Sequence, residues 1–178
     1  MVLLLVKLII FVVANAGILF VSWKPLSNPR SHGFYRFFAF EFTLALILLN
    51  LENWFRDPFS IHQIVSWLLL FVSIVLVAHG IYLLRVVGRP KSGIESTTTL
   101  VIVGAYKYIR HPLYSSLLFL AWGVFFKAPS ILGGILAAVA TAFLVTTARI
   151  EESENVQKFG VEYAAYMKTT RMFIPFLF

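Results

Sequence analysis

Long apolar runs separated by short polar breaks dominate this sequence. A bilayer core about 30 Å thick needs roughly 20 helical residues at about 1.5 Å each, so runs near that length predict membrane-spanning helices. Five runs qualify, and most of the breaks between them pair a proline with a charged residue. The five predicted spans are residues 2–21, 34–51, 61–84, 113–126 and 130–148. The pattern predicts an all-α integral membrane protein with about five transmembrane helices.

The fourth run is shorter than the others and reaches only about 21 Å. It borrows flanking residues, lies where the membrane is thin, or forms a re-entrant hairpin with the fifth run. Its connection to the fifth run is the tight turn Lys127-Ala128-Pro129. We therefore expect spans four and five to form a helical hairpin with adjacent polar ends.

The composition agrees with a membrane location. The 178 residues are 60% hydrophobic and 13% charged, whereas soluble domains are about half apolar and a quarter charged. The first run lacks a basic leader and is long enough to remain as a span, so we do not expect a cleaved signal peptide. The chain has no cysteine, which excludes disulfides, thiolate metal sites and cysteine nucleophiles.

The charges predict an orientation. The sequence has 15 Lys and Arg against 8 Asp and Glu, a net charge of +7. With five spans, twelve of the basic residues fall on one side, Arg56 and Lys127 fall on the other, and Lys7 lies inside the first span. Because Lys and Arg accumulate in cytoplasmic loops, the N-terminus is predicted outside and the C-terminus inside. The basic excess is therefore interpreted as orientation, with no nucleic-acid partner.

Two long polar segments, 85–112 and 149–178, are then cytoplasmic. The chain is expected to form one membrane domain, 1–178, in which 1–84 supplies three spans and 85–178 supplies a binding loop, the hairpin and a tail. Within the loop, the Thr-rich stretch 96–103 before Gly104 predicts extended chain followed by a turn.

The tail is predicted to begin as a helix and to end on the membrane. Apolar residues recur there at spacings of three and four, which predicts one helical stripe of Val156, Phe159, Tyr163 and Met167. The apolar end, 172–178, is expected to lie back on the membrane interface or on the bundle.

A first polar cluster lies where the loop becomes span four, in residues 104–114. Pro112 suits the first turn of a helix, where its missing N–H costs nothing. The free N–H groups after it, together with Arg110 and His111, would form a local anion site. An ordinary interfacial anchor facing lipid phosphates explains the same residues.

A second cluster, Arg149, Glu151 and Glu152, follows span five directly. Arg149 and Glu152 share a helix face, while Glu151 points about 100° away. A solvated helix start is the plainer explanation in isolation. The hairpin, however, brings this cluster to the first, and together they offer cations, aromatic rings and carboxylates to a zwitterionic ligand that carries a ring.

Three polar residues are predicted at a similar depth inside the spans: Asn15, Glu41 and His79. Such residues are costly in a membrane and always raise a functional hypothesis. Hydrogen bonding between helices is the simpler explanation. Glu41 and His79 alone do not indicate a metal site, since a third ligand is missing.

The combined pattern of both clusters resembles the isoprenylcysteine carboxyl methyltransferase family of integral membrane enzymes, and its archaeal member most closely. The pattern is Gly104-x-Tyr106-x-x-x-Arg110-His111-Pro112-x-Tyr114, a hydrophobic hairpin, Arg149-x-Glu151-Glu152, and Phe159-Gly160-x-x-Tyr163-x-x-Tyr166. The likeness covers roughly residues 97–175. Asn155 departs from it, because the family usually has an apolar residue there.

The resemblance implies S-adenosylmethionine as methyl donor and S-adenosylhomocysteine as product. It implies a cytoplasmic cofactor pocket built from the hairpin and the tail. Arg149 becomes the candidate for the substrate-side arginine, and Arg149 and Glu152 are the implied catalytic residues. The implied cofactor-binding residues are Thr99, Leu100, Val101 and Tyr106 near the adenine, with Arg110, His111, Pro112, Tyr114, Glu151 and Glu152 completing the pocket.

The resemblance further implies methyl transfer to the carboxylate of a lipid-like, prenylcysteine-type substrate that enters from the bilayer. The partners would be such a small molecule or a prenylated peptide, together with membrane lipids. A carboxylate is already ionised at neutral pH, so this chemistry needs no general base. It needs alignment of the reacting atoms and exclusion of water.

Three alternatives remain open. A phospholipid or amine methyltransferase would use the same cofactor pocket. A membrane reductase using NADPH is disfavoured by the absence of a Gly-rich dinucleotide loop. A membrane scaffold without enzymatic activity would use the basic loops to bind anionic lipid.

Overall fold

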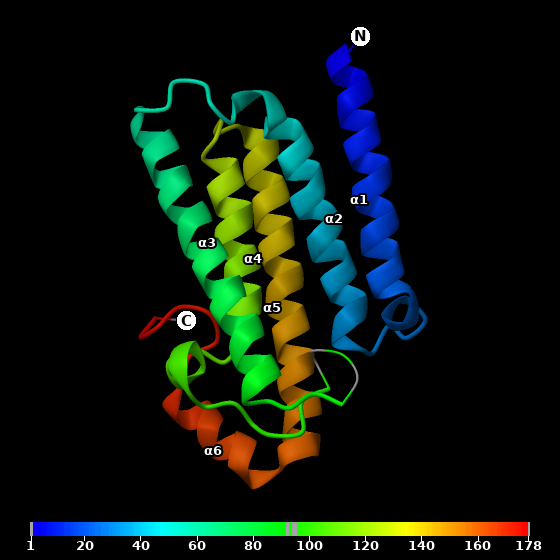
Figure 1. Cartoon of the computed structure of the whole chain (residues 1–178), viewed down its shortest axis with the longest axis vertical. Coiled ribbons are helices and arrows are strands. Elements are labelled where there is room, and N and C mark those ends of the chain that lie inside the picture. Colours follow the sequence, from blue (N-terminus) through cyan, green and yellow to red (C-terminus); the bar gives the residue numbers. More distant parts are fainter. Residues whose placement is uncertain (1, 92, 94–95, 178) are drawn as a thin grey trace.

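The computed structural model describes residues 2–91, 93 and 96–177, and this part of the chain is helical without a β-strand. Long helices run side by side along the long axis, and α6 lies across their lower end (Figure 1). An isolated parallel bridge joins Ile109 to Arg171. The elements are α1 Val2–Leu26, α2 His32–Asn50, η1 Leu51–Asn53, α3 Ile61–Val86, η2 Gly104–Lys107, α4 Pro112–Phe125, α5 Ile131–Phe159 and α6 Val161–Thr169.

The predicted fold class is confirmed. Four helices are long and apolar enough to cross a membrane, and they correspond to predicted spans one, two, three and five. The fourth predicted span is the shorter apolar helix α4. At 29 residues, α5 is about 43 Å long. Because this exceeds the bilayer core, we expect roughly its last ten residues, from Arg149 onward, where the charged residues of the helix lie, to project beyond the membrane.

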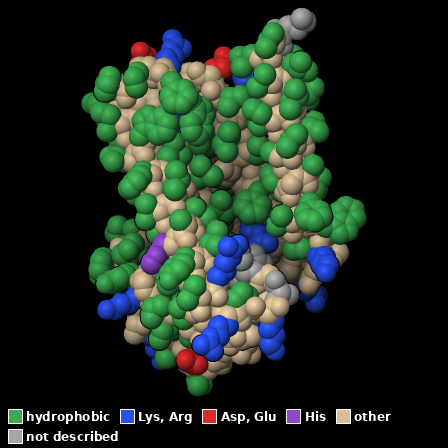
Figure 2. All heavy atoms as spheres, viewed as in Figure 1, with side chains coloured by type: hydrophobic (Ala, Val, Ile, Leu, Met, Phe, Trp, Pro, Cys, Tyr) green, Lys and Arg blue, Asp and Glu red, His purple; other side chains and the backbone are tan. Residues whose placement is uncertain are grey.

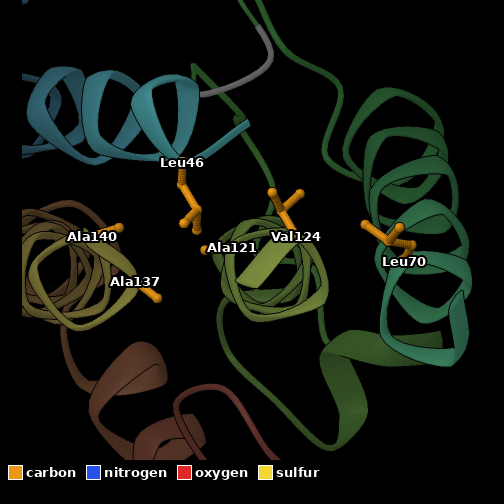
Figure 3. Packing of buried hydrophobic residues seen from close by; sticks show 6 residues of the cluster. All are labelled: Leu46, Leu70, Ala121, Val124, Ala137 and Ala140. Carbon is orange, nitrogen blue, oxygen red and sulfur yellow. The ribbon is translucent and has the colours of Figure 1, made fainter. Parts of the chain in front are cut away.

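Helix α4 lies at the centre of the bundle, in contact with α2, α3 and α5. The core cluster draws residues from all four helices, with alanines on α4 and α5 that allow close approach. Buried hydroxyls add hydrogen bonds, since Ser66 Oγ donates to the Gly123 carbonyl at 2.7 Å and Ser73 Oγ to the Ser116 carbonyl at 2.8 Å. Figure 3 displays the cluster: Leu46, Leu70, Ala121, Val124, Ala137 and Ala140.

Helix α1 packs chiefly against α2 and is otherwise exposed, apart from the buried Ser22. Lys7 pairs with Glu52 at 2.7 Å. With the Asn15 amide turned so that its nitrogen faces Glu41, that nitrogen lies 3.2 Å from both carboxylate oxygens. Two of the three predicted intramembrane polar residues thus link α1 to α2. His79 lies apart from them, beside Gly104.

The tail differs from the single helical stripe that the sequence predicted. Helix α5 continues unbroken from the predicted fifth span to Phe159, and Gly160, with φ of 60°, then starts α6 in a new direction. Glycine reaches this left-handed conformation without a steric penalty. Val156 is 38% exposed while Tyr163 is 3% exposed, so the spacing of three and four does not bury one common face.

The apolar end of the tail packs on the bundle, which is one of the two locations that the sequence predicted. Phe173 is 1% exposed and lies in a cluster with Ala39, Tyr114, Leu144 and Ala148. Ser115 Oγ donates to the Phe173 carbonyl at 2.8 Å. Phe176 and Leu177 remain largely exposed. Phe173 therefore helps to anchor the tail between α2, α4 and α5.

Lys127, in the turn between α4 and α5, is 1% exposed. Its ammonium donates to Gln63 Oε1 at 3.0 Å and lies 3.3 Å from the centre of the Trp67 ring. Gln63 in turn donates to the Lys127 carbonyl at 3.0 Å. A desolvated cation over an aromatic face contributes about 2 kcal/mol. This network fixes the end of the hairpin against α3.

The substitution Lys127→Met is expected to destabilise the protein by about 1–3 kcal/mol, because Gln63 Oε1 loses its donor and the cation–aromatic contact disappears. The measurement is thermal unfolding in detergent. Arg56→Met is the control, since Arg56 lies exposed on the same end of the molecule and should change stability by less than about 0.5 kcal/mol. Equal effects from both substitutions would contradict a structural role of Lys127.

Candidate active site

A cavity of about 390 Å³ opens at the lower end of the bundle, within the size range of small-molecule sites. Figure 2 shows the molecule hollowed between α3 and α1, above a belt of Lys and Arg side chains. One part of the lining is apolar and comes from the helices: Val21, Phe40, Val77, Ile81, Leu84, Leu113 and Leu117. The polar part is Arg36, Thr97, Tyr106, Arg110, His111, Tyr114, Ser116, Glu151, Asn155, Tyr163 and Tyr166.

The first polar cluster forms one wall of this cavity. Pro112 lies in the first turn of α4, as the sequence predicted, and His111 is the N-cap of this helix. The backbone before them is tied to the tail, because the Arg110 N–H donates to the Arg171 carbonyl at 2.8 Å and the His111 N–H to the Met172 carbonyl at 3.2 Å. The tail therefore sets the position of both side chains.

Arg110 is engaged by the protein itself. Its Nε donates to Glu152 Oε1 at 2.5 Å, and one terminal nitrogen donates to the Thr170 carbonyl at 2.5 Å and to the Met167 carbonyl at 3.2 Å. Both side chains of the ion pair are only 10% exposed. Arg110 thus joins the loop, α5 and the end of α6, while it also lines the cavity.

The two adjacent glutamates contact different partners. Glu152 Oε1 lies 3.3 Å from His111 Nε2, in addition to its bond with Arg110. Glu151 accepts a hydrogen bond from the Tyr114 hydroxyl and lies 4.0 Å from His111 Nδ1. His111 is 4% exposed and stacks on Tyr114, with ring centres 5.4 Å apart. Glu152 thus contacts His111 and Arg110 without lining the cavity, whereas Glu151 lines the cavity.

The charges of these groups follow from their surroundings. Burial alone would raise the pKa of Glu152, but hydrogen bonds and electrostatic interactions with His111 and Arg110 lower this pKa below its usual 4.5. Glu152 is therefore ionised at neutral pH. Burial raises the pKa of Tyr106 and of Tyr166, so both hydroxyls stay neutral. The Tyr166 hydroxyl donates to the Tyr106 carbonyl at 2.6 Å and holds η2 against α6.

Most of the predicted site residues come together at this cavity. Glu152 lies directly behind the lining, Pro112 begins α4, Thr99 is exposed with its N–H bonded to the Gly88 carbonyl, and Arg149 is exposed on α5. These four are not among the lining residues. The predicted residues that line the cavity are Leu100, Val101, Tyr106, Arg110, His111, Tyr114 and Glu151.

Sequence reasoning missed Arg36 and underrated Asn155. Arg36, on α2, is 7% exposed, lines the cavity and is hydrogen-bonded to Tyr114. The sequence signal that could have identified Arg36 is its position as an arginine inside a predicted span, but Arg36 was used only to predict the membrane orientation. Asn155 lines the cavity and is hydrogen-bonded to Tyr163. Its polarity therefore changes the cavity wall as well as local packing.

Comparisons with known proteins give consistent results. The family model for phospholipid methyltransferases matches residues 61–161, more than half of the chain. Methanethiol S-methyltransferase 1 of Bradyrhizobium diazoefficiens is 27% identical over 88% of this chain, and methanethiol S-methyltransferase of Pseudomonas deceptionensis is 24% identical over 94%. The chain spans only 59% and 58% of the length of these two relatives. No solved structure matches.

Proposed function

We propose that this chain, which belongs to the phospholipid methyltransferase family, transfers a methyl group from S-adenosylmethionine to an apolar acceptor in the cavity. The observation that carries the proposal is the convergence of His111, Tyr114 and Glu151 on a cavity whose other part is lined by apolar side chains of the spans. A polar compartment joined to an apolar one suits a charged donor and an acceptor that dissolves in the bilayer.

The chemistry of the lining fits the donor. Its ring would pack among Leu100, Val101 and Tyr106, with the Thr99 backbone alongside. His111, Pro112 and Tyr114 would hold the ribose and methionine end. When bound, S-adenosylmethionine supplies a methyl group on a positively charged sulfur and leaves as S-adenosylhomocysteine.

The remaining residues position the side chains of the site and surround the acceptor. Glu152 holds His111 and Arg110 in place through its two hydrogen bonds, and we assign it a positioning role in the site. The apolar lining from α1, α2, α3 and α4 would keep water away from the acceptor. Fixing both reactants in one cavity contributes to the rate by orienting the reacting atoms.

Our first candidate acceptor is a small apolar thiol. The support is that the curated relatives named above are methanethiol S-methyltransferases. A cysteine thiol has a pKa of about 8.5, and a simple alkyl thiol is a weaker acid, so the acceptor is mostly protonated at neutral pH. Its proton therefore needs an acceptor, and Glu151 is the carboxylate that lines the cavity.

Our second candidate acceptor is the carboxylate of a prenylcysteine-type lipid, as the motif pattern implies. The observation in its favour is Arg36, a buried arginine on the cavity wall next to the apolar lining. A guanidinium binds a carboxylate through two parallel hydrogen bonds. Arg149 retains this role as the alternative assignment from the sequence.

We place the active site on the cytoplasmic side of the membrane. The support is the accumulation of Lys and Arg around the lower end of the molecule, while apolar side chains cover the helices above (Figure 2). The N-terminus would then lie outside.

Calorimetric titration of the detergent-purified chain with S-adenosylmethionine and with S-adenosylhomocysteine tests the donor. We expect saturable binding of both. Transfer of a labelled methyl group is then measured with methanethiol, with a farnesylcysteine derivative and with phosphatidylethanolamine, which separates the acceptor classes. Well-folded protein that binds neither cofactor form would overturn the proposal.

A further inference from the structure

A second cavity, of about 230 Å³, is bordered by η2 and α6, which also contribute lining residues to the first cavity. It shares no lining residue with the first cavity. Its walls come from η2, from the end of α6 and from the tail. The lining residues are Lys107, Tyr108, Lys168, Thr169, Arg171, Pro175 and Phe176.

Three cations from three separate segments converge on this cavity. Lys107 ends η2, Lys168 lies in the last turn of α6, and Arg171 follows α6 in the tail. All three are exposed. Among the described residues, none of them forms an ion pair with a carboxylate, and no acidic residue lines the cavity. The cavity therefore presents concentrated positive charge to an anion.

The other wall of the cavity is apolar and lies close to the expected level of the membrane surface. Phe176 is 85% exposed and the adjacent Leu177 is 80% exposed. In Figure 1 the C-terminal end lies level with the lower ends of α1 and α2 and above α6. Those helix ends mark the expected boundary of the bilayer. Exposed apolar side chains next to cations at that boundary are typical of contact with anionic lipid.

We infer that the Lys107–Lys168–Arg171 cavity binds the phosphate group of an anionic membrane lipid, with the acyl chains passing along Phe176 and Leu177. The ligand chemistry is a phosphodiester whose two non-bridging oxygens accept hydrogen bonds from Lys and Arg donors. A free phosphate ion offers similar oxygens but does not use the apolar wall. The lipid is therefore the expected occupant.

Lipid bound here would stabilise the active-site segments through the backbone. The Arg171 N–H donates to the Tyr108 carbonyl at 3.1 Å, and its carbonyl accepts from the Arg110 N–H at 2.8 Å. Two residues further on, Phe173 packs against the His111 ring, with centres 6.1 Å apart. The cationic cavity and the His111 wall thus share one short stretch of tail, and a ligand that binds only the folded tail stabilises both.

Thermal unfolding of the detergent-purified chain tests this inference with three additives: phosphatidylglycerol, phosphatidylcholine and inorganic phosphate. Phosphatidylglycerol at about a hundredfold excess over its Kd should raise the unfolding midpoint by roughly 5–10 °C. Phosphatidylcholine and inorganic phosphate should leave it almost unchanged. The result does not depend on cofactor binding, so it stands apart from the proposed methyl transfer.

The test variant carries Lys107→Gln, Lys168→Gln and Arg171→Gln, which are exposed substitutions that should fold. The control carries Lys24→Gln, Arg85→Gln and Lys91→Gln, which remove the same charge from the same end of the molecule. We expect the phosphatidylglycerol shift to vanish in the test variant and to persist in the control. Equal shifts in the two variants, no shift in the unaltered chain, or an equal shift with inorganic phosphate would each overturn the inference.

Discussion

Glu152→Gln is expected to weaken S-adenosylmethionine binding at least tenfold and to lower turnover by roughly a hundredfold, although Glu152 lies outside the cavity lining. Its carboxylate accepts from Arg110 Nε at 2.5 Å and lies 3.3 Å from His111 Nε2. Removing one partner of a buried ion pair costs about 3–5 kcal/mol, because the other charge is left uncompensated. Here that charge is Arg110, and its displacement would move His111 as well.

Calorimetric titration and thermal unfolding should be measured on the same samples. Glu152→Asp keeps the charge and should recover part of the affinity. This recovery would distinguish displaced His111 and Arg110 side chains in a folded protein from a general loss of fold. Glu162→Gln, an exposed residue on α6, is the control and should bind the cofactor as the unaltered chain does. If folded Glu152→Gln protein retains its affinity within twofold, the positioning role of Glu152 is wrong.

Arg36→Met is expected to reduce kcat/KM for the acceptor by more than tenfold, whereas Arg149→Met should change it by less than twofold. Arg36 is buried in the cavity wall and hydrogen-bonded to Tyr114, which in turn donates to Glu151. Arg149 is exposed on the outside of α5 and does not line the cavity. A tenfold loss corresponds to about 1.4 kcal/mol of transition-state stabilisation.

The measurement is initial-rate kinetics at saturating S-adenosylmethionine, with cofactor affinity determined in parallel. If Arg36 binds an acceptor carboxylate, the loss should be much larger for a prenylcysteine carboxylate than for methanethiol. If Arg36 only orients Tyr114 and Glu151, the two acceptors should lose alike. The reverse ranking, with Arg149→Met the weaker enzyme, would restore the assignment made from the motif.

The pattern of apolar runs and polar breaks along the sequence was enough to predict the membrane-spanning helices. Each apolar run satisfies its backbone hydrogen bonds within one helix, so length and composition predict it without knowledge of its neighbours. The predicted spans 34–51 and 61–84 differ from α2 (His32–Asn50) and α3 (Ile61–Val86) by at most two residues at either end. The prediction of one helical apolar stripe across Gly160 is wrong, because the spacing of apolar residues does not reveal that Gly160, with φ of 60°, changes the direction of the chain.

The sequence by itself determined an all-helical membrane chain, the start of α4 at Pro112 and the residues of two polar clusters, because helix formation and hydropathy are local properties. Only the tertiary structure decided which of those residues face one cavity. It brought Arg36 from α2 to Tyr114, turned Glu152 toward Arg110 while Glu151 faces the cavity, and left Arg149 outside. These contacts join residues far apart in the chain, and packing between helices fixes them; no local pattern records them.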